Sequence, residues 1–293
     1  MAERRSLAMA TLLHLSDLHF GAHDPAIVEA LERHIDEAKV DLIVISGDFT
    51  QRAKKAEFEE ACAFLTRVRE SGHQVLAIPG NHDIPLYDVL RRFLSPLTRY
   101  RKYIDETLCP FHELDGVSVL GINTARSATF KGGSISHEQR DLIRDTFSKT
   151  DTAKVRVLVT HHPLFALPTG DGGELGAPVD HQDEALSEVA ELGIDLLLAG
   201  HNHLASSSAN ALVHGSGRAL VVQAGTATST RVRGQGQSFN RIEIEPGKVR
   251  VTIEQWSGTR FETGDSQCFV QRGEHWDLVG GPEATPVLEK VAQ

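Results

Sequence analysis

Five short segments of the sequence combine carboxylate, amide and imidazole side chains that could bind metal ions. In chain order they are Asp17-x-His19, Gly47-Asp48, Gly80-Asn81-His82-Asp83, His161-His162-Pro163 and Gly200-His201-x-His203. Taken singly, each segment is more often a polar turn than a site. Each of the five, however, directly follows a short apolar run that is typical of a buried strand. Chance does not explain the whole set.

The residue types indicate which ions such a site would bind. Carboxylate and amide oxygens mixed with imidazoles suit Mn, Fe or Zn ions. The three cysteines are widely spaced and form no Cys-x-x-Cys pair, which argues against a structural zinc cluster. Two metal ions bridged by one carboxylate can clamp phosphate oxygens, activate a water and stabilise the charge of the transition state. The segments therefore indicate a two-metal centre for phosphoester chemistry.

Alternating strands and helices are needed to position these side chains. The apolar runs predict strands at residues 10–15, 41–45, 74–78, 117–122, 154–160 and 195–199. Between them, helical patterns cover residues 25–38, 54–71, 86–103, 137–148 and 182–192. This alternation is typical of βαβ units in a parallel or mixed sheet, where ligands bind outside the carboxyl ends of the strands.

After residue 204 the sequence predicts strands rather than helices, at residues 218–224, 238–245 and 248–255. We expect this continuation to form a second sheet packed against the first, with the helices outside. The expected domain organisation is one α/β domain over residues 1–271 and a loosely ordered C-terminal tail over residues 272–293. Residues 169–180 and 228–237 are predicted to be loops because they are rich in Gly and small polar residues.

Together, the five segments resemble those of the calcineurin-like metallophosphoesterase superfamily. The pattern D-x-H…GD…GNHD…H…GHxH resembles its bacterial class III branch, the cyclic-nucleotide and glycerophosphodiester phosphodiesterases. The resemblance covers about residues 10–225, and no expected ligand position departs from the pattern. It implies a four-layer αββα sandwich of two mixed β-sheets flanked by helices.

The resemblance also implies a role for each residue of the five segments. The implied metal ligands are Asp17, His19 and His203 for one ion, Asn81, His161 and His201 for the other, and Asp48 as the bridge between them. His82 is expected to hydrogen-bond the phosphate and to protonate the leaving alkoxide. Asp83 is expected to fix the orientation of His82 and to favour its charged form. The role of His162 is left open between a substrate-facing and a structural one.

The implied activity is hydrolysis of a small phosphodiester, a cyclic nucleotide or a glycerophosphodiester-like compound, by attack of a metal-bound hydroxide on phosphorus. A phosphomonoesterase, a DNA nuclease or a protein phosphatase on the same scaffold remains an alternative, as does a non-enzymatic interaction module. Arg52 follows Asp48 without the continuation that marks the protein phosphatase branch. Arg231 and Arg233 could reach a phosphate or lie on a solvated loop.

The formal charge of −10 argues against a nucleic acid polymer as partner. No apolar stretch approaches the roughly 18–20 residues that a membrane span needs, so no membrane partner is expected. The N-terminal apolar run leads straight into Asp17 and His19, which favours a core strand over a signal peptide. We therefore expect a cytoplasmic location. Relatives of the implied family often form dimers, so a homodimer is possible.

Overall fold

The computed structural model describes residues 10–128, 132–164, 167–168, 174–175, 179, 182–203, 205–208, 219–231, 236–273 and 275–281. The helices are α1 (Pro25–Glu37), α2 (Lys55–Glu70), α3 (Val89–Leu94), α4 (Thr98–Tyr103), α5 (His137–Lys149) and α6 (Gln182–Glu191), and a 3-10 turn covers Asn81–Asp83. No helix of the described residues is long and apolar enough to cross a membrane.

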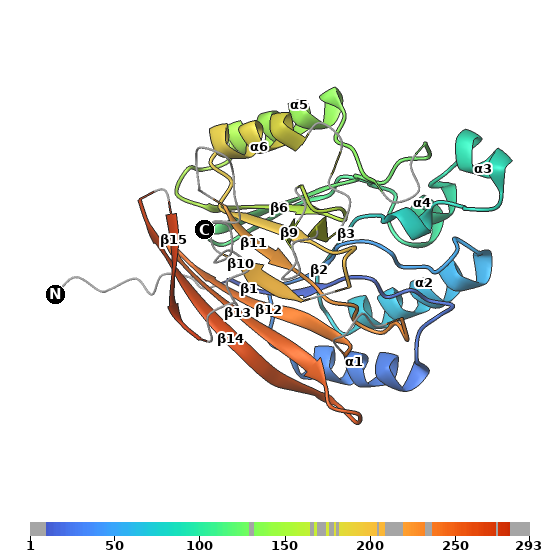
Figure 1. The fold of residues 1–293 in the computed structure, drawn as a ribbon. Coiled ribbons are helices and arrows are strands. Elements are labelled where there is room, and N and C mark those ends of the chain that lie inside the picture. Colours follow the sequence, from blue (N-terminus) through green and yellow to red (C-terminus); the bar gives the residue numbers. More distant parts are fainter. Residues whose placement is uncertain are drawn as a thin grey trace, which may run out of the picture.

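Two mixed sheets account for most of the strands (Figure 1). The first has the order β15-β14-β13-β12-β1-β2-β3, and the second has the order β10-β11-β9-β6-β5-β4. The first sheet consists of β1 (Ala10–Leu15), β2 (Leu42–Ile45), β3 (Val75–Ala77), β12 (Ser238–Glu245), β13 (Lys248–Trp256), β14 (Phe261–Arg272) and β15 (His275–Gly280). The second consists of β4 (Phe111–Leu114), β5 (Val117–Ile122), β6 (Val155–Thr160), β9 (Leu196–Ala199), β10 (Ser206–Ser208) and β11 (Leu220–Gln223), and β7 (Leu167–Pro168) pairs with β8 (Glu174–Leu175).

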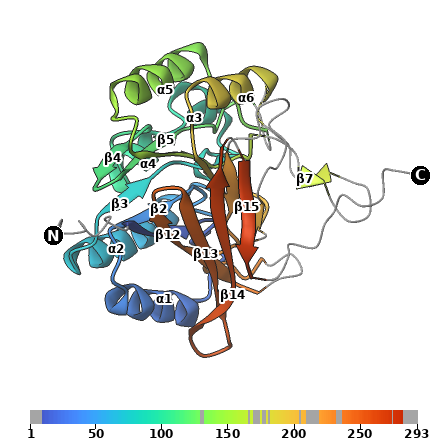
Figure 2. The ribbon, with the colours of Figure 1, turned by 90° about the vertical axis from the view of Figure 1, so that its left-hand side faces the viewer.

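The period-2 alternation of side chains along each strand produces four layers (Figures 1 and 2). On β1, Leu13 and Leu15 belong to the apolar cluster that holds α1 and α2 against the first sheet. Leu12 points the other way, into the cluster between the two sheets. On the second sheet, Leu158 belongs to the outer cluster that also contains Phe147 of α5. The strands are therefore buried on both faces, as their continuous apolar runs predict, and the four-layer αββα sandwich is confirmed.

The C-terminal strands do not form a second sheet of their own, so this prediction is wrong. β12 pairs antiparallel with β1, and β13, β14 and β15 extend the first sheet beyond it. β11 instead pairs parallel with β9 in the second sheet. The second sheet is thus built mainly from the middle of the chain. A sequence pattern cannot distinguish these arrangements, because either one buries the same apolar faces.

The predicted helix at residues 86–103 is broken into α3 and α4. Pro96 lies between them; proline lacks an N–H donor and disfavours the helical conformation of the residue before it.

The tail predicted from residue 272 also needs correction. β14 ends at Arg272, and β15 pairs with it along Cys268–Arg272. Residues 282–293 and most of the predicted loop at 169–180 lie outside the described residues.

Candidate metal centre

The predicted site residues follow the carboxyl ends of five strands. β1, β2 and β3 of the first sheet lead to Asp17, Asp48 and Asn81, and β6 and β9 of the second lead to His161 and His201. Backbone hydrogen bonds tie these strand ends together: Asp17 N donates to Gly47 O, and Gly200 N to His161 O, each at 3.1 Å. The centre therefore lies where the carboxyl-terminal edges of the two sheets meet.

One group of possible ligands consists of Asp17, His19 and His203, all buried. The Nε2 atoms of His19 and His203 lie 3.3 Å apart, and they approach Asp17 Oδ1 to 3.5 and 3.2 Å. The other carboxylate oxygen, Oδ2, accepts hydrogen bonds from Ser16 Oγ at 2.6 Å and His201 N at 3.0 Å. Oδ1 has no hydrogen-bond donor among the described residues, which leaves it available to a cation.

The second group consists of Asn81, His161 and His201. Asn81 Oδ1 lies 3.1 Å from both His161 Nε2 and His201 Nδ1, and the two ring nitrogens are 3.3 Å apart. An amide oxygen and two imidazole nitrogens that converge in this way are suitable donors for one divalent cation.

Asp48 lies between the two groups. Its Oδ2 is 3.8 Å from His19 Nε2 and 3.4 Å from His161 Nε2, while Oδ1 accepts a hydrogen bond from His82 N at 2.8 Å. One carboxylate oxygen thus faces both groups, as a bridging ligand would. The structure brings all seven predicted ligands together, and their oxygen and nitrogen atoms fit a pair of metal ions.

Backbone carbonyls on the far side of two histidine rings orient the ligand nitrogens. His161 Nδ1 lies 2.7 Å from Ser46 O, and His203 Nδ1 lies 3.1 Å from Arg231 O. Because a carbonyl can only accept, Nδ1 carries the proton in each ring and Nε2 is left as the ligand atom of the neutral form. The side-chain motifs give no signal for these carbonyl partners.

The electrostatics of the site favour positive charge. Burial lowers the pKa of His161, but the adjacent Asp48 carboxylate outweighs it and raises that pKa to about 9. Burial likewise works to raise the pKa of Asp17, but the imidazoles of His19 and His203 hold it well below its usual range. Burial and then the positive charge of His161 lower the pKa of His201 to about 4. Two buried carboxylates therefore create a field that attracts cations.

The backbone at the ligands is unusual. Five of the seven ligands have positive φ: Asp17 at 53°, His19 at 49°, Asp48 at 54°, His201 at 70° and His203 at 58°. Residues other than glycine seldom adopt this left-handed conformation, which costs roughly 1–3 kcal/mol when a structure imposes it. Such strain is concentrated at functional sites, and here it turns each side chain into the centre directly after its strand.

His82 lies beside this centre, as predicted, but Asp83 does not orient it. The rings of His82 and His19 meet edge to face, with their centroids 4.8 Å apart. His82 Nδ1 lies 2.7 Å from Gln51 O, so a backbone carbonyl fixes the ring. The buried Asp83 carboxylate instead accepts from the backbone N–H groups of Phe49, Thr50 and Gly80. Burial raises the pKa of Asp83 to about 6, and the charge of Asp48 adds to this effect.

The residues whose roles the sequence leaves open lie around the centre. His162 is buried; its Nδ1 is 2.9 Å from Thr124 Oγ1, and its ring centroid is 4.7 Å from that of His201. Arg231 is exposed, and its Nη1 donates to Gln51 Oε1 at 3.4 Å. Arg52 is also exposed and lies over the Tyr87 ring, 5.8 Å from the ring centroid. Arg233 lies outside the described residues.

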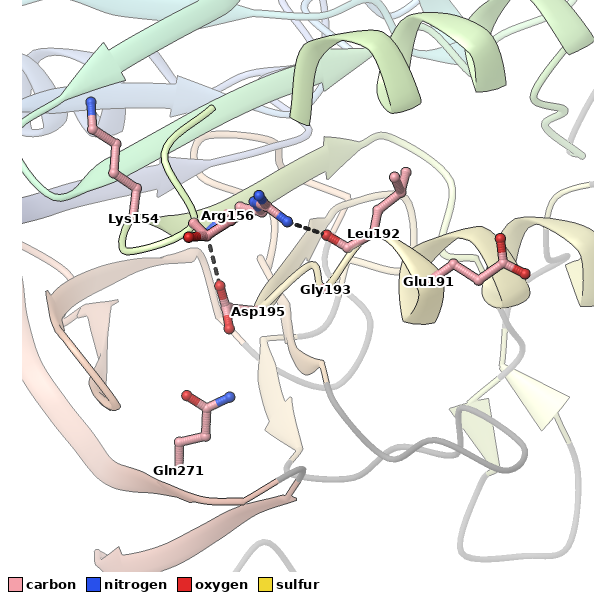
Figure 3. A pocket seen from close by; sticks show the side chains of 8 residues that line it. Lys154, Arg156, Glu191, Leu192, Gly193, Asp195 and Gln271 are labelled. Carbon is pink, nitrogen blue, oxygen red and sulfur yellow. Dashed lines mark hydrogen bonds between the residues drawn. The ribbon is translucent and has the colours of Figure 1, made fainter. Parts of the chain in front are cut away.

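A separate cavity of about 360 Å³ lies at the opposite ends of β6 and β9 (Figure 3). Lys154 and Asp195, which directly precede these strands, line it together with Arg156 and Gln271. The side chain of Arg156 is already engaged, since its Nη1 donates to Leu192 O at 2.5 Å. The cavity contains none of the predicted site residues and lies at the wrong end of the strands to belong to the metal centre.

Comparison with solved structures finds the same fold in other proteins. The structure of PhoD matches with a TM-score of 0.71 and 11% identity, over 95% of this chain and 73% of that one. The purple acid phosphatase PPD1 from yellow lupin (Lupinus luteus) seeds matches with a TM-score of 0.66 and 10% identity, over 87% of this chain. This chain spans 53% of the length of that phosphatase. At such identities the likeness shows the fold alone.

A comparison with curated protein sequences found no match. The sequence profile of the calcineurin-like phosphoesterases matches residues 10–205, which is well over half of the chain and includes every predicted ligand. Within that span the structure brings the seven side chains to one buried centre. The chain therefore belongs to the calcineurin-like phosphoesterase family.

Proposed function

We propose that this protein hydrolyses small phosphodiesters, of the cyclic-nucleotide or glycerophosphodiester class, with two cations of Mn, Fe or Zn. The observation that carries the proposal is the position of Asp48, whose Oδ2 faces His19 on one side and His161 on the other. A carboxylate placed in this way is suited to hold two cations close together. When bound, the cations would supply a nucleophilic water and neutralise charge on the phosphate.

The chain's own residues position the reactants and move a proton. Asp17, Asp48 and the ligand histidines keep the site buried and fix its charge. His82 is only half-buried, at the edge of the centre, and its Nδ1 donates to Gln51 O. As an imidazolium it carries a second proton on Nε2. In the proposed step the water oxygen bonds to phosphorus and releases a proton to solvent, the ester P–O bond breaks, and the leaving oxygen takes the Nε2 proton of His82.

The preference for diesters is supported by the exposure of the bordering arginines. A monoester dianion gains more from cationic side chains than a diester monoanion does. Arg231 and Arg52 are exposed, so solvent screens their charges. The groups that they contact, the Gln51 amide and the Tyr87 ring, are neutral. This arrangement suits a singly charged substrate in the cytoplasm better than a doubly charged one.

A substrate panel tests the proposal directly. The protein, loaded with Mn²⁺, is given bis(p-nitrophenyl) phosphate, p-nitrophenyl phosphate and cyclic AMP. We expect turnover of the diesters to exceed that of the monoester. Turnover of the monoester alone would contradict the diester assignment, and a metal-loaded protein that cleaved no phosphoester would contradict the enzymatic one.

Metal analysis of an Asp48→Asn variant tests the bridge. The asparagine keeps the size of the side chain and removes its charge, so we expect less metal per chain and loss of turnover. Asp41→Asn is the matched control, because Asp41 directly precedes the same strand at its opposite end and accepts a hydrogen bond from Thr11 N at 2.7 Å. Full metal content in the Asp48→Asn variant would contradict the bridging role.

A further inference from the structure

The segment between the metal centre and α4 exposes a continuous set of large apolar side chains. Six of them lie within nine residues, and their exposed fractions range from 40% to 76%: Leu86, Tyr87, Val89, Leu90, Phe93 and Leu94. We call these six residues the apolar ridge. They lie on and just before α3, which projects from the body of the molecule at the upper right of Figure 1. Large apolar patches on a soluble domain mark interaction sites.

The ridge is held to the protein by a polar anchor. Arg92, on the same helix, is buried; its Nε donates to Ser127 O at 2.7 Å and its Nη1 to Pro85 O at 3.2 Å. This side chain thus attaches α3 to the rest of the fold. The exposed apolar side chains are therefore presented by a fixed element.

The charge around the ridge differs in sign from that of the whole chain. Residues 86–103 contain five cations and one acid: Arg91, Arg92, Arg99, Arg101 and Lys102 against Asp88. Of these cations, Arg101 and Lys102 are exposed, while Arg91 pairs with Asp88 at 3.5 Å and Arg99 donates to Ala53 O at 2.6 Å. Asp105 and Glu106 follow beyond α4. The chain as a whole has a formal charge of −10. The exposed cations near the ridge are therefore Arg101 and Lys102 on the following helix and Arg52, which lies over the Tyr87 ring.

We propose that the apolar ridge docks this protein on the surface of an anionic phospholipid membrane. Aromatic and aliphatic side chains enter the boundary between headgroups and acyl chains, and nearby Arg and Lys side chains attract anionic lipids. A second copy of the chain is a poorer occupant, because a two-fold interface would place the same cations against one another. Surface docking needs no membrane-spanning segment, so it is compatible with the absence of a long apolar run.

The ridge also adjoins the metal centre. Tyr87 lies under the guanidinium of Arg52, and the neighbouring Gln51 carbonyl holds the His82 ring. A docked molecule would therefore keep the edge of the centre close to the lipid headgroups, which are themselves phosphodiesters. The docking does not depend on the proposed function, because it rests on the ridge and its charges.

Vesicle flotation tests the proposal. The full chain is mixed with vesicles of phosphatidylcholine alone or of phosphatidylcholine with phosphatidylglycerol. We expect it to float with the anionic vesicles and to dissociate as salt is raised. Phe93→Ser and Leu94→Ser should each lower the partition coefficient by roughly tenfold, the equivalent of burying one such side chain. Turnover of soluble bis(p-nitrophenyl) phosphate should stay unchanged in both variants, which also shows that they are folded.

Phe111→Ser is the matched control, since Phe111 is an exposed phenylalanine of β4 outside the ridge. The proposal is overturned if the unmodified chain stays unbound to anionic vesicles, or if Phe111→Ser reduces flotation as much as Phe93→Ser. Sedimentation of the same samples provides a second measurement. A dimer that Phe93→Ser dissociates, without any binding to vesicles, would assign the ridge to a second copy of the chain and would also overturn the proposal.

Discussion

At the scale of single residues, the centre depends on carbonyl groups as much as on its ligands. Ser46 O, Arg231 O and Gln51 O each accept a hydrogen bond from a histidine Nδ1 and so determine what the opposite nitrogen can do. For His161 and His203 that nitrogen would be a metal ligand, and for His82 it would be the proton donor of the proposed step. The same hydrogen bond from Nδ1 to a carbonyl therefore occurs in histidines with two different roles. The position of each ring relative to the carboxylates distinguishes these roles.

This division predicts the behaviour of His82→Ala. Both metals should stay bound, because the other seven side chains supply the ligands. Turnover should fall by ~10²-fold or more when the leaving group is an alkyl alcohol, which needs a proton to depart. The fall should be smaller for p-nitrophenolate, which leaves readily without one. Kinetics on both kinds of substrate, with metal analysis, measure this. His73→Ala is the control, because His73 precedes β3 at the end of the strand away from the centre. Loss of a metal ion in His82→Ala would show that His82 is a ligand.

The structure assigns Asp83 to the support of the backbone. Its carboxylate accepts from Thr50 N and Gly80 N at 2.9 Å and from Phe49 N at 3.2 Å, and so joins the loops after β2 and β3. We expect Asp83→Ala to lower the free energy of unfolding by about 3 kcal/mol or more, because several buried N–H groups lose their acceptor. Thermal denaturation measures this, with Asp265→Ala on the exposed part of β14 as control. An unchanged melting temperature would restore a role for Asp83 at His82.

The convergence of the seven side chains could be predicted from the sequence, because each motif contains a donor residue directly after a predicted strand. The true partner of His82 could not, because any residue can contribute a backbone carbonyl and its side chain gives no indication. Asp83 was misassigned for the same reason. Its place beside His82 in the sequence suggested a side-chain contact, whereas the turn at Asn81–Asp83 directs its carboxylate toward backbone donors.

At the scale of elements, the strand ends are packed too tightly for additional atoms. Gly80 follows β3, and a Cβ built on it would lie 2.2 Å from Asp48 Oδ1 and 2.4 Å from Asp48 N. A Cβ on Gly47, where φ is +98°, would lie 2.6 Å from His161 Nδ1. These glycines let two loops approach closely enough for their ligands to share one centre.

Gly80→Ala should therefore damage the centre without changing any ligand. The added methyl group would displace the backbone and carboxylate of Asp48, so we expect reduced metal content and a loss of turnover comparable to that of Asp48→Asn. Gly236→Ala is the control, since a Cβ at Gly236 meets nothing within 4 Å. A metal titration monitored by calorimetry measures the affinity for metal ions. Normal affinity in Gly80→Ala would mean that the close approach of these loops is not required.

Most elements that carry ligands were predicted to within a residue or two, because buried parallel strands have continuous apolar runs that end abruptly. β4 and β14 were not predicted from the sequence. β4 is a short edge strand, and β14 contains a polar stretch that is mostly exposed, so neither shows a buried apolar pattern. The break between α3 and α4 could have been inferred from Pro96, which lies between the two helices.

At the scale of the molecule, the two sheets divide the work of the centre. The first sheet supplies Asp17, Asp48 and Asn81, and the second supplies His161 and His201, so the centre exists only while the sheets stay packed. The cluster between them contains residues from both ends of the chain, including Leu12 of β1 and Trp276 of β15. The sequence could not reveal that Leu12 and Trp276 share this cluster, because that depends on which sheet edge the last strands join.

The role of β15 in this packing yields a prediction. Trp276 is 1% exposed within the cluster between the sheets, whereas Val279 on the same strand is 50% exposed. Trp276→Ala should lower the free energy of unfolding by about 3–5 kcal/mol, the usual cost of such a cavity, and Val279→Ala should change it little. Chemical denaturation of both variants measures this. Equal stability of the two would return residues 275–280 to the tail that the sequence predicts, and would mean that the sheets hold the metal ligands together without β15.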